Sequence, residues 1–146
     1  MTPRIIYLIK RTEIEVTSRM SKVLEKCGLT PIQYTLLYFI DINKGDFSSA
    51  QLSRRFSVKP QSMNELVQLL EQKKLVKKAT DPAHKRILRI SLTKKGTQLL
   101  QTSSAALDEL EKDMLQELSA TETETLKHLL RCILETARQA KEVKSQ

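Results

Sequence analysis

Residues 48–72 read as two short helices separated by one tight turn, and this feature limits the possible folds more than any other. Ser48 and Gln51 have the spacing of a capping box, which predicts the start of the first helix. Pro60 suits the first position of the second helix. Proline lacks a backbone N–H, and the N–H at this position would have no partner within the helix. The second helix carries one apolar stripe at helical spacing, formed by Met63, Leu66, Val67 and Leu70. Two short helices joined in this way are typical of a helix-turn-helix.

The side of the second helix opposite this stripe carries amides and hydroxyls, where an ordinary solvated helix would carry Lys and Glu. Such groups can pair with base edges in the major groove of DNA. We therefore expect this side of the helix to read DNA. Its residues are Gln61, Ser62, Asn64, Glu65 and Gln68.

A β-hairpin is predicted directly after the second helix, with strands over residues 75–80 and 87–92. Three apolar residues alternate along its second strand and are expected to face the core, namely Leu88, Ile90 and Leu92. The loop between the strands carries three adjacent basic or ionisable groups, His84, Lys85 and Arg86. Like charges repel one another in a folded domain, so this cluster indicates an anionic partner.

Further helices are predicted on both sides of this segment. A first helix precedes Thr30, which caps a second helix that is nearly all apolar and is expected to be buried, Tyr38 included. Thr93 and Ser119 can each cap a longer helix, and the tail from 139 to 146 is expected to be loose. The sequence therefore predicts a mainly α fold with a small antiparallel β-hairpin, in one domain.

Positive charge is concentrated in the middle of the chain. The formal net charge is +8 and the isoelectric point is near 9.6. Residues 46–96 contain twelve Lys and Arg against four Asp and Glu, whereas residues 97–146 contain six against nine. Because the excess coincides with the helix-turn-helix, we favour double-stranded DNA as the partner over a merely solvated basic face. Candidate phosphate contacts outside the second helix include Arg54, Arg55, Lys59 and Arg89.

Several classes of protein are not expected. No apolar stretch approaches the roughly 18 residues of a membrane span, and the N-terminus is charged too early for a signal peptide, so we expect a cytoplasmic protein without a membrane partner. Cys27 and Cys132 are too far apart for a disulfide framework or a zinc motif, and we interpret them as small core residues. The chain has no nucleophile motif or metal-binding pattern, so no enzyme activity, catalytic residue, metal or cofactor is expected.

The order of these features resembles the MarR family of transcriptional regulators. No single matching stretch is specific for the family, but the order and spacing of the stretches together are specific. The matching stretches are residues 28–30, 50–52, 58–62, 70–76, 81–86 and 90–96. The resemblance implies a winged helix-turn-helix with long N- and C-terminal dimerisation helices.

The resemblance also implies how the chain is organised and what it binds. It implies one MarR-like domain over residues 1–146, with a DNA-binding lobe at 30–96 and a helical dimerisation region at 1–29 and 97–146. It further implies a homodimer on a pseudo-palindromic operator, a hairpin that enters the minor groove as a wing, and repression relieved by a small-molecule effector or an oxidant. The residues expected to contact DNA are Arg54, Arg55, Lys59, Gln61, Ser62, Asn64, Glu65, Gln68, His84, Lys85 and Arg86.

Three positions depart from the family pattern. The family's wing usually has an Asp where His84 stands, and its recognition helix often has an Arg where Glu65 stands. A Gly usually follows that helix where Lys74 stands. Lys74 is therefore expected at a position that favours positive φ.

An effector site and a redox site are suggested only by the resemblance. In relatives, the ligand pocket lies between the dimerisation helices and the DNA-binding lobe, which makes Arg19, Tyr34 and Tyr38 candidate ligand contacts. Some relatives use a reactive cysteine on the first helix, so Cys27 is a candidate sensor, although its apolar stripe favours packing. Two alternatives stay open: a redox-sensing regulator acting through Cys27, and a basic winged-helix module that binds a protein or the nucleoid.

Overall fold

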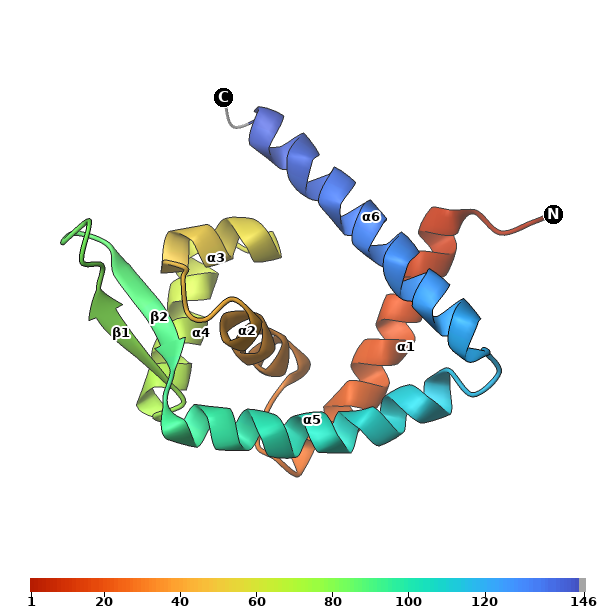
Figure 1. Ribbon diagram of the computed structural model, residues 1–146, viewed down its shortest axis with the longest axis horizontal. Helices are drawn as coiled ribbons and strands as arrows, with labels where there is room; N and C mark the ends of the chain where they lie inside the picture. Colours follow the sequence, from red (N-terminus) through yellow and green to blue (C-terminus); the bar gives the residue numbers. More distant parts are fainter. Residues whose placement is uncertain (145–146) are drawn as a thin grey trace. The chain divides into compact units, whose positions relative to one another are not determined.

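The computed structural model describes residues 1–144 and forms two compact units, Met1–Leu110 and Glu111–Gln146. The described residues contain six helices and one two-stranded antiparallel sheet (Figure 1). The elements are α1 (Ile5–Glu25), α2 (Pro31–Ile42), α3 (Ser49–Phe56), α4 (Pro60–Gln72), β1 (Val76–Thr80), β2 (Leu88–Leu92), α5 (Lys94–Met114) and α6 (Ala120–Lys144). The predicted fold class, mainly helical with an antiparallel hairpin, is confirmed. The division into a lobe and a dimerisation region stays a prediction.

Side-chain caps start α2 and α3 where the sequence predicts them. The Thr30 hydroxyl accepts a hydrogen bond from the Gln33 amide at 3.4 Å, and the Gln33 side chain accepts one from the Thr30 amide at 3.1 Å. Ser48 and Gln51 make the same pair of bonds at the start of α3, at 3.3 and 2.9 Å. Since a side-chain cap contributes about 1 kcal/mol, these boundaries are set by local sequence.

The core of residues 1–110 is built around α2. The side chains of Leu36 and Leu37 are fully buried, and the Phe39 ring packs edge-on against Phe47 and Phe56, with centroid distances of 5.0 and 5.3 Å. The same core includes buried residues from α3, α4 and β2, namely Leu52, Met63, Val67, Leu70 and Ile90. Full burial of one such side chain contributes about 1.5–3 kcal/mol. Apolar packing therefore fixes the two helices of the helix-turn-helix against α2.

The chain is tightly constrained on both sides of the hairpin. Before it, Lys74 follows the end of α4 with a φ of 61°, which confirms the positive φ predicted there. After it, the Thr93 hydroxyl accepts a hydrogen bond from the Gly96 amide at 3.0 Å and starts α5. A Cβ on Gly96 would lie 2.0 Å from the carbonyl oxygen of Leu75. Glycine at this position therefore lets α5 approach the backbone that leads into β1.

Some expectations about burial and order are wrong. Leu88 pairs with Thr80 at the outer end of the hairpin, beyond the core, and is 48% exposed. Tyr38 is 47% exposed because it borders an open hollow beside α5. Cys132 is exposed rather than part of the core. The tail expected to be loose is helical as far as Lys144, and residues 145 and 146 lie outside the described residues.

α1 and α6 each carry large apolar side chains that the single chain leaves exposed. In α1, Ile5 and Ile6 are 70% and 78% exposed. Four apolar residues of α6 are between 43% and 69% exposed, namely Leu129, Leu130, Ile133 and Leu134. None of the helices in residues 1–144 is both long and apolar enough to cross a membrane. Exposed apolar side chains grouped along a helix are typical of a protein–protein interface.

Candidate nucleic-acid interface

The turn between α3 and α4 is short, and it directs one side of α4 outward. Ser57 ends α3 in the left-handed region with a φ of 55°, and Lys59 leads in extended conformation into Pro60. Leu52 of α3 and Met63 of α4 are fully buried, so the two helices pack through their apolar sides. The opposite side of α4 is left exposed to solvent.

The five α4 residues predicted to contact bases are all exposed, and together they form what we call the recognition face: Gln61, Ser62, Asn64, Glu65 and Gln68. Two hydrogen bonds order this face. Gln61 Nε2 donates to Glu65 Oε1 at 3.3 Å. The Ser49 hydroxyl at the start of α3 donates to Asn64 Oδ1. The amide of Asn64 is thus oriented by the neighbouring helix before any partner binds.

The predicted phosphate contacts near the recognition face have different surroundings. Arg54, Arg55 and Lys59 are all exposed. The Arg55 guanidinium lies over the Phe39 ring, 5.5 Å from its centroid. This cation–π contact holds Arg55 near α2, whereas Arg54 and Lys59 have no such ring contact within the described residues.

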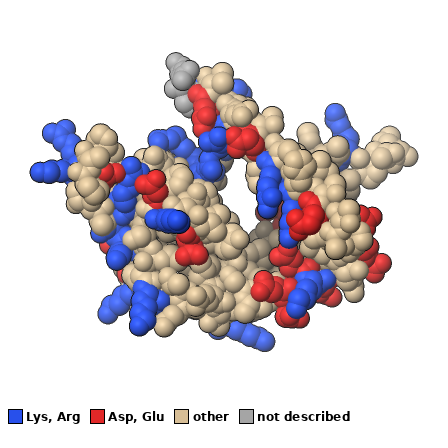
Figure 2. Space-filling view, in the orientation of Figure 1, with Lys and Arg blue, Asp and Glu red and all other residues tan. Residues whose placement is uncertain are grey.

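The hairpin tip, residues 81–87, is a compact turn. The Asp81 amide donates to the Ile87 carbonyl oxygen at 2.9 Å, and the Ile87 amide donates to the His84 carbonyl oxygen at 2.8 Å. His84, Lys85 and Arg86 are exposed on this turn. Figure 2 shows positive side chains at the projecting end of the hairpin, at the upper left of the view. The structure thus presents the predicted basic cluster to solvent.

Arg89 is engaged within the protein, a role that the sequence did not suggest. Its Nε donates to Asp81 Oδ2 at 2.6 Å, and its Nη1 donates to Gln51 Oε1 at 2.8 Å and to the Asp46 carbonyl oxygen at 3.0 Å. The hydrogen bond from Arg89 is the largest cause that holds the pKa of the Asp81 carboxyl below its ordinary value, and the Ala83 amide adds to it. The sequence alone places Arg89 among the candidate phosphate contacts, since two of these partners lie 38 and 43 residues away and no local pattern indicates them.

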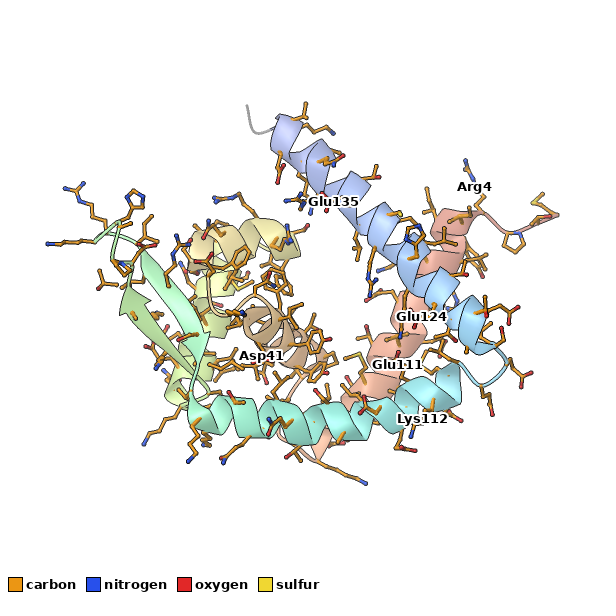
Figure 3. All side chains as sticks on the ribbon, in the orientation of Figure 1. Arg4, Asp41, Glu111, Lys112, Glu124 and Glu135 are labelled. Atoms are coloured by element: carbon orange, nitrogen blue, oxygen red, sulfur yellow. The ribbon has the colours of Figure 1, made fainter. Side chains whose placement is uncertain are left out.

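The predicted effector residues are only partly brought together. The rings of Tyr34 and Tyr38 stack on α2 with centroids 6.0 Å apart, and the Tyr34 hydroxyl lies 3.0 Å from Ser104 Oγ of α5. Tyr38 lines a hollow of about 280 Å³ between α2 and α5, together with Asp41, which lies on the α5 side of α2 (Figure 3). Arg19 is not among the residues that line this hollow.

The cysteines and histidines do not assemble a metal site. Cys27 is partly buried in the turn after α1, and Cys132 is exposed with its Sγ 3.6 Å from His128 Nε2. Within residues 1–144, no three His, Cys, Asp or Glu side chains are placed to share a metal ion. The redox role of Cys27 stays a hypothesis.

Known proteins match the region of the candidate interface and most of the chain. The model of the MarR family matches residues 28–87, from just before α2 to the hairpin tip. The chain is similar to the HTH-type transcriptional repressor Rv2887 of Mycobacterium tuberculosis, with 29% identity over 124 residues that cover 85% of this chain and 88% of that protein.

Two solved structures show the same fold. The chain is similar to MepR in the S. aureus MepR–DNA complex, with a TM-score of 0.75, 22% identity, and coverage of 92% of this chain and 96% of that one. It is also similar to CouR from Rhodococcus jostii RHA1 bound to p-coumaroyl-CoA, with a TM-score of 0.78, 21% identity, and coverage of 90% and 91%.

Proposed function

This chain belongs to the MarR family of transcriptional regulators, and we propose that it is a homodimeric repressor that binds operator DNA and is released by a small ligand. The observation that carries this proposal is the recognition face, on which five exposed polar side chains occupy the outward side of α4. Amide, hydroxyl and carboxylate groups are the groups that pair with base edges in the major groove. The role proposed for the protein is regulatory and not enzymatic.

On DNA, we assign base reading to the recognition face and charge neutralisation to the cations around it. Arg54, Arg55 and Lys59 contact phosphates beside α4, and Lys85 does so at the hairpin tip. Arg86 enters the minor groove, because its planar and weakly hydrated guanidinium suits a narrow, electronegative groove better than an ammonium does. Each phosphate neutralised adds about 0.9 to the slope of log affinity against log salt.

The dimer follows from the apolar side chains that α1 and α6 expose. We propose that residues 1–29 and 97–146 form the dimerisation region and that residues 30–96 form the DNA-binding lobe. A two-fold dimer presents two α4 helices to half-sites about 34–36 Å apart, which requires a pseudo-palindromic operator. Sedimentation at micromolar concentration is expected to detect no monomer, and a stable folded monomer there would contradict this arrangement.

We place the effector near α2. Tyr38, which lines the hollow, and Tyr34, which stacks beside it, are the candidate contacts. Arg19 is a further candidate on α1. CouR, which has the same fold, was solved bound to p-coumaroyl-CoA, and this supports a small organic molecule as the class of effector. Because α2 packs directly against the helix-turn-helix, a ligand that shifts α2 also shifts α4. This link provides the route by which binding releases DNA.

The proposal is tested by fluorescence anisotropy with two duplexes, the DNA upstream of the chain's own gene and a random duplex of equal length. A specific repressor is expected to prefer its operator by about a thousandfold or more at physiological salt. Equal binding of both duplexes would identify the alternative, a basic module of the nucleoid, and no binding of either would identify a protein-interaction module. Release by peroxide in the wild type but not in Cys27→Ser would identify the redox-sensing alternative.

A further inference from the structure

Arg89 of β2 connects three separate parts of the DNA-binding unit. Its Nε bonds to Asp81 at the hairpin tip, and its Nη1 bonds to Gln51 in α3 and to the backbone of Asp46 before α3. The side chains of Arg89 and Asp81 are only 25% and 11% exposed. Arg89 thus lies inside the unit, and its cationic group is mostly occupied by partners within the chain.

Asp81 uses both carboxylate oxygens to order the hairpin tip. Oδ2 accepts from Arg89, while Oδ1 accepts from the amides of Ala83 at 2.7 Å and His84 at 3.2 Å. These bonds fix the backbone that carries Lys85 and Arg86. The direction of the basic side chains at the tip therefore depends on a carboxylate that Arg89 holds in place.

Gln51 ties the same network to the helix-turn-helix. Its Oε1 accepts from the Ser48 amide at 2.9 Å, which caps α3, and from Arg89 Nη1 at 2.8 Å. α3 in turn packs against α4 through the buried Leu52 and Met63. A continuous series of contacts thus runs from the hairpin tip through Asp81, Arg89 and Gln51 to the recognition helix.

We propose that Arg89 is a positioning residue that sets the distance between the hairpin tip and α4, so that both reach adjacent grooves of one DNA half-site together. This inference rests on the proposed function. A tip that is already ordered loses less conformational entropy on binding, which increases affinity for the site whose groove spacing matches. Arg89 acts through Asp81 and Gln51 and does not itself touch DNA.

Two conservative variants separate this role from a simple charge effect. Arg89→Lys keeps the charge but lacks the planar fork that reaches two partners at once. Asp81→Asn removes a negative charge near a polyanion, which on electrostatic grounds alone strengthens DNA binding. The positioning role predicts the opposite sign, with both variants binding the operator about tenfold more weakly and losing less affinity for random duplex.

Asp46→Asn is the matched control for charge. Asp46 accepts a hydrogen bond from Arg89 only through its backbone carbonyl, and the residue is exposed in the same region. This control removes one carboxylate but leaves the network intact, so it is expected to bind the operator as tightly as the wild type or more tightly. Equal effects of Asp46→Asn and Asp81→Asn would overturn the proposal.

A second measurement needs no DNA and uses the full-length protein. Trypsin cleaves after Lys85 and Arg86 when the tip opens, so the cleavage rate reports how well the tip is ordered. We expect Arg89→Lys and Asp81→Asn to raise this rate at least about threefold over the wild type and Asp46→Asn, with unchanged far-UV circular dichroism.

The two assays distinguish the possible failures. If the wild type shows no preference for its operator, the proposed function fails, while the cleavage assay still decides whether Arg89 orders the tip. Unchanged cleavage in both variants overturns the inference, whatever the DNA result. Faster cleavage with unchanged operator binding also overturns it, because tip order would then have no effect on DNA recognition.

Discussion

The two parts of the proposed DNA interface are held in place by different forces. α4 is held by apolar packing, since Met63, Val67 and Leu70 have no exposed surface. The hairpin tip is held by hydrogen bonds that converge on Asp81, one of them from Arg89. Apolar packing is nearly independent of pH and salt, whereas a carboxylate network changes when the carboxylate is protonated. The recognition helix is therefore the constant part of the interface, and the tip is the part that solution conditions can alter.

The largest expected effect is on the packed side of α4. Leu70→Ala removes a fully buried side chain and is expected to lower the free energy of unfolding by about 2–5 kcal/mol. Urea denaturation at one fixed protein concentration measures the change, because the stability of the proposed dimer depends on concentration. Gln68→Ala on the recognition face is the control, and it is expected to change stability by about 0.5 kcal/mol or less. Equal losses in both variants would mean that the two sides of α4 are not distinguished by packing.

The second effect concerns the hairpin tip, where Arg86 and Lys85 are expected to have different roles on DNA. Arg86→Ala is expected to weaken operator binding about tenfold and to abolish a preference for A·T-rich flanks, because it removes the guanidinium assigned to the minor groove. Lys85→Ala is expected to weaken all duplexes alike and to lower the salt slope by about 0.9 for each phosphate that is no longer neutralised. Anisotropy with A·T-flanked and G·C-flanked operators at several salt concentrations measures both.

The two variants serve as controls for each other, since each removes one cation from the same turn. If they behave identically on both flanks, the tip does not enter the minor groove, and its charges are part of a diffuse positive surface. The recognition face of α4 would then account for all of the sequence preference.

α4 was more predictable from the sequence than the tip, and the reason is physical. The start of α4 follows from Pro60 at its first position, since Lys59 before it makes no side-chain cap, and the outward side of α4 follows from helical periodicity. The positive φ at Lys74 was also predictable, because it belongs to the end of one helix. Local rules of this kind operate inside a single element.

The remaining features depend on residues that only the fold brings together. Arg89 meets Gln51 and Asp46 across 38 and 43 positions, and no local pattern indicates either contact. The cation–π contact of Arg55 with Phe39 and the hollow beside Tyr38 are likewise formed between elements. The apolar stripe of α6 suggests a buried Cys132, but no residue of α6 is buried in the single chain.

A third and smaller effect tests whether the ordered recognition face reads a base. Glu65 Oε1 already accepts a hydrogen bond from Gln61, which leaves the other oxygen available to a cytosine N4 group. Glu65→Gln is expected to reduce the preference at one base pair by about fivefold and to leave other positions unchanged. Binding to a set of operators with single base-pair changes measures this. Uniformly tighter binding would place Glu65 near a phosphate, and no change at all would place it away from DNA.

The smallest expected effect is a local response of the tip to acid. The pKa of Asp81 is lowered in the folded protein, chiefly by its hydrogen bond from Arg89, from an ordinary value of 3.8. Because the pKa is lowered, the ionised Asp81 carboxylate stabilises the folded protein fully above about pH 3.8. This stabilisation is lost as the pH falls through the lower pKa of the folded state. The tip is therefore expected to stay ordered from neutral pH down to about pH 4 and to loosen only below it.

This response is measured by the NMR amide signal of Ala83, which donates to Asp81, compared with the amide of Val67 in the packed core of α4. A His84→Ala background removes the neighbouring imidazole, so that the Ala83 signal reports on Asp81 alone. The Ala83 signal is expected to shift below pH 4 while that of Val67 does not, and Asp81→Asn is expected to lack the transition. A transition of Ala83 between pH 5 and 7 would show that Asp81 does not control the tip. Simultaneous transitions of both amides would show that the tip and α4 are not held independently.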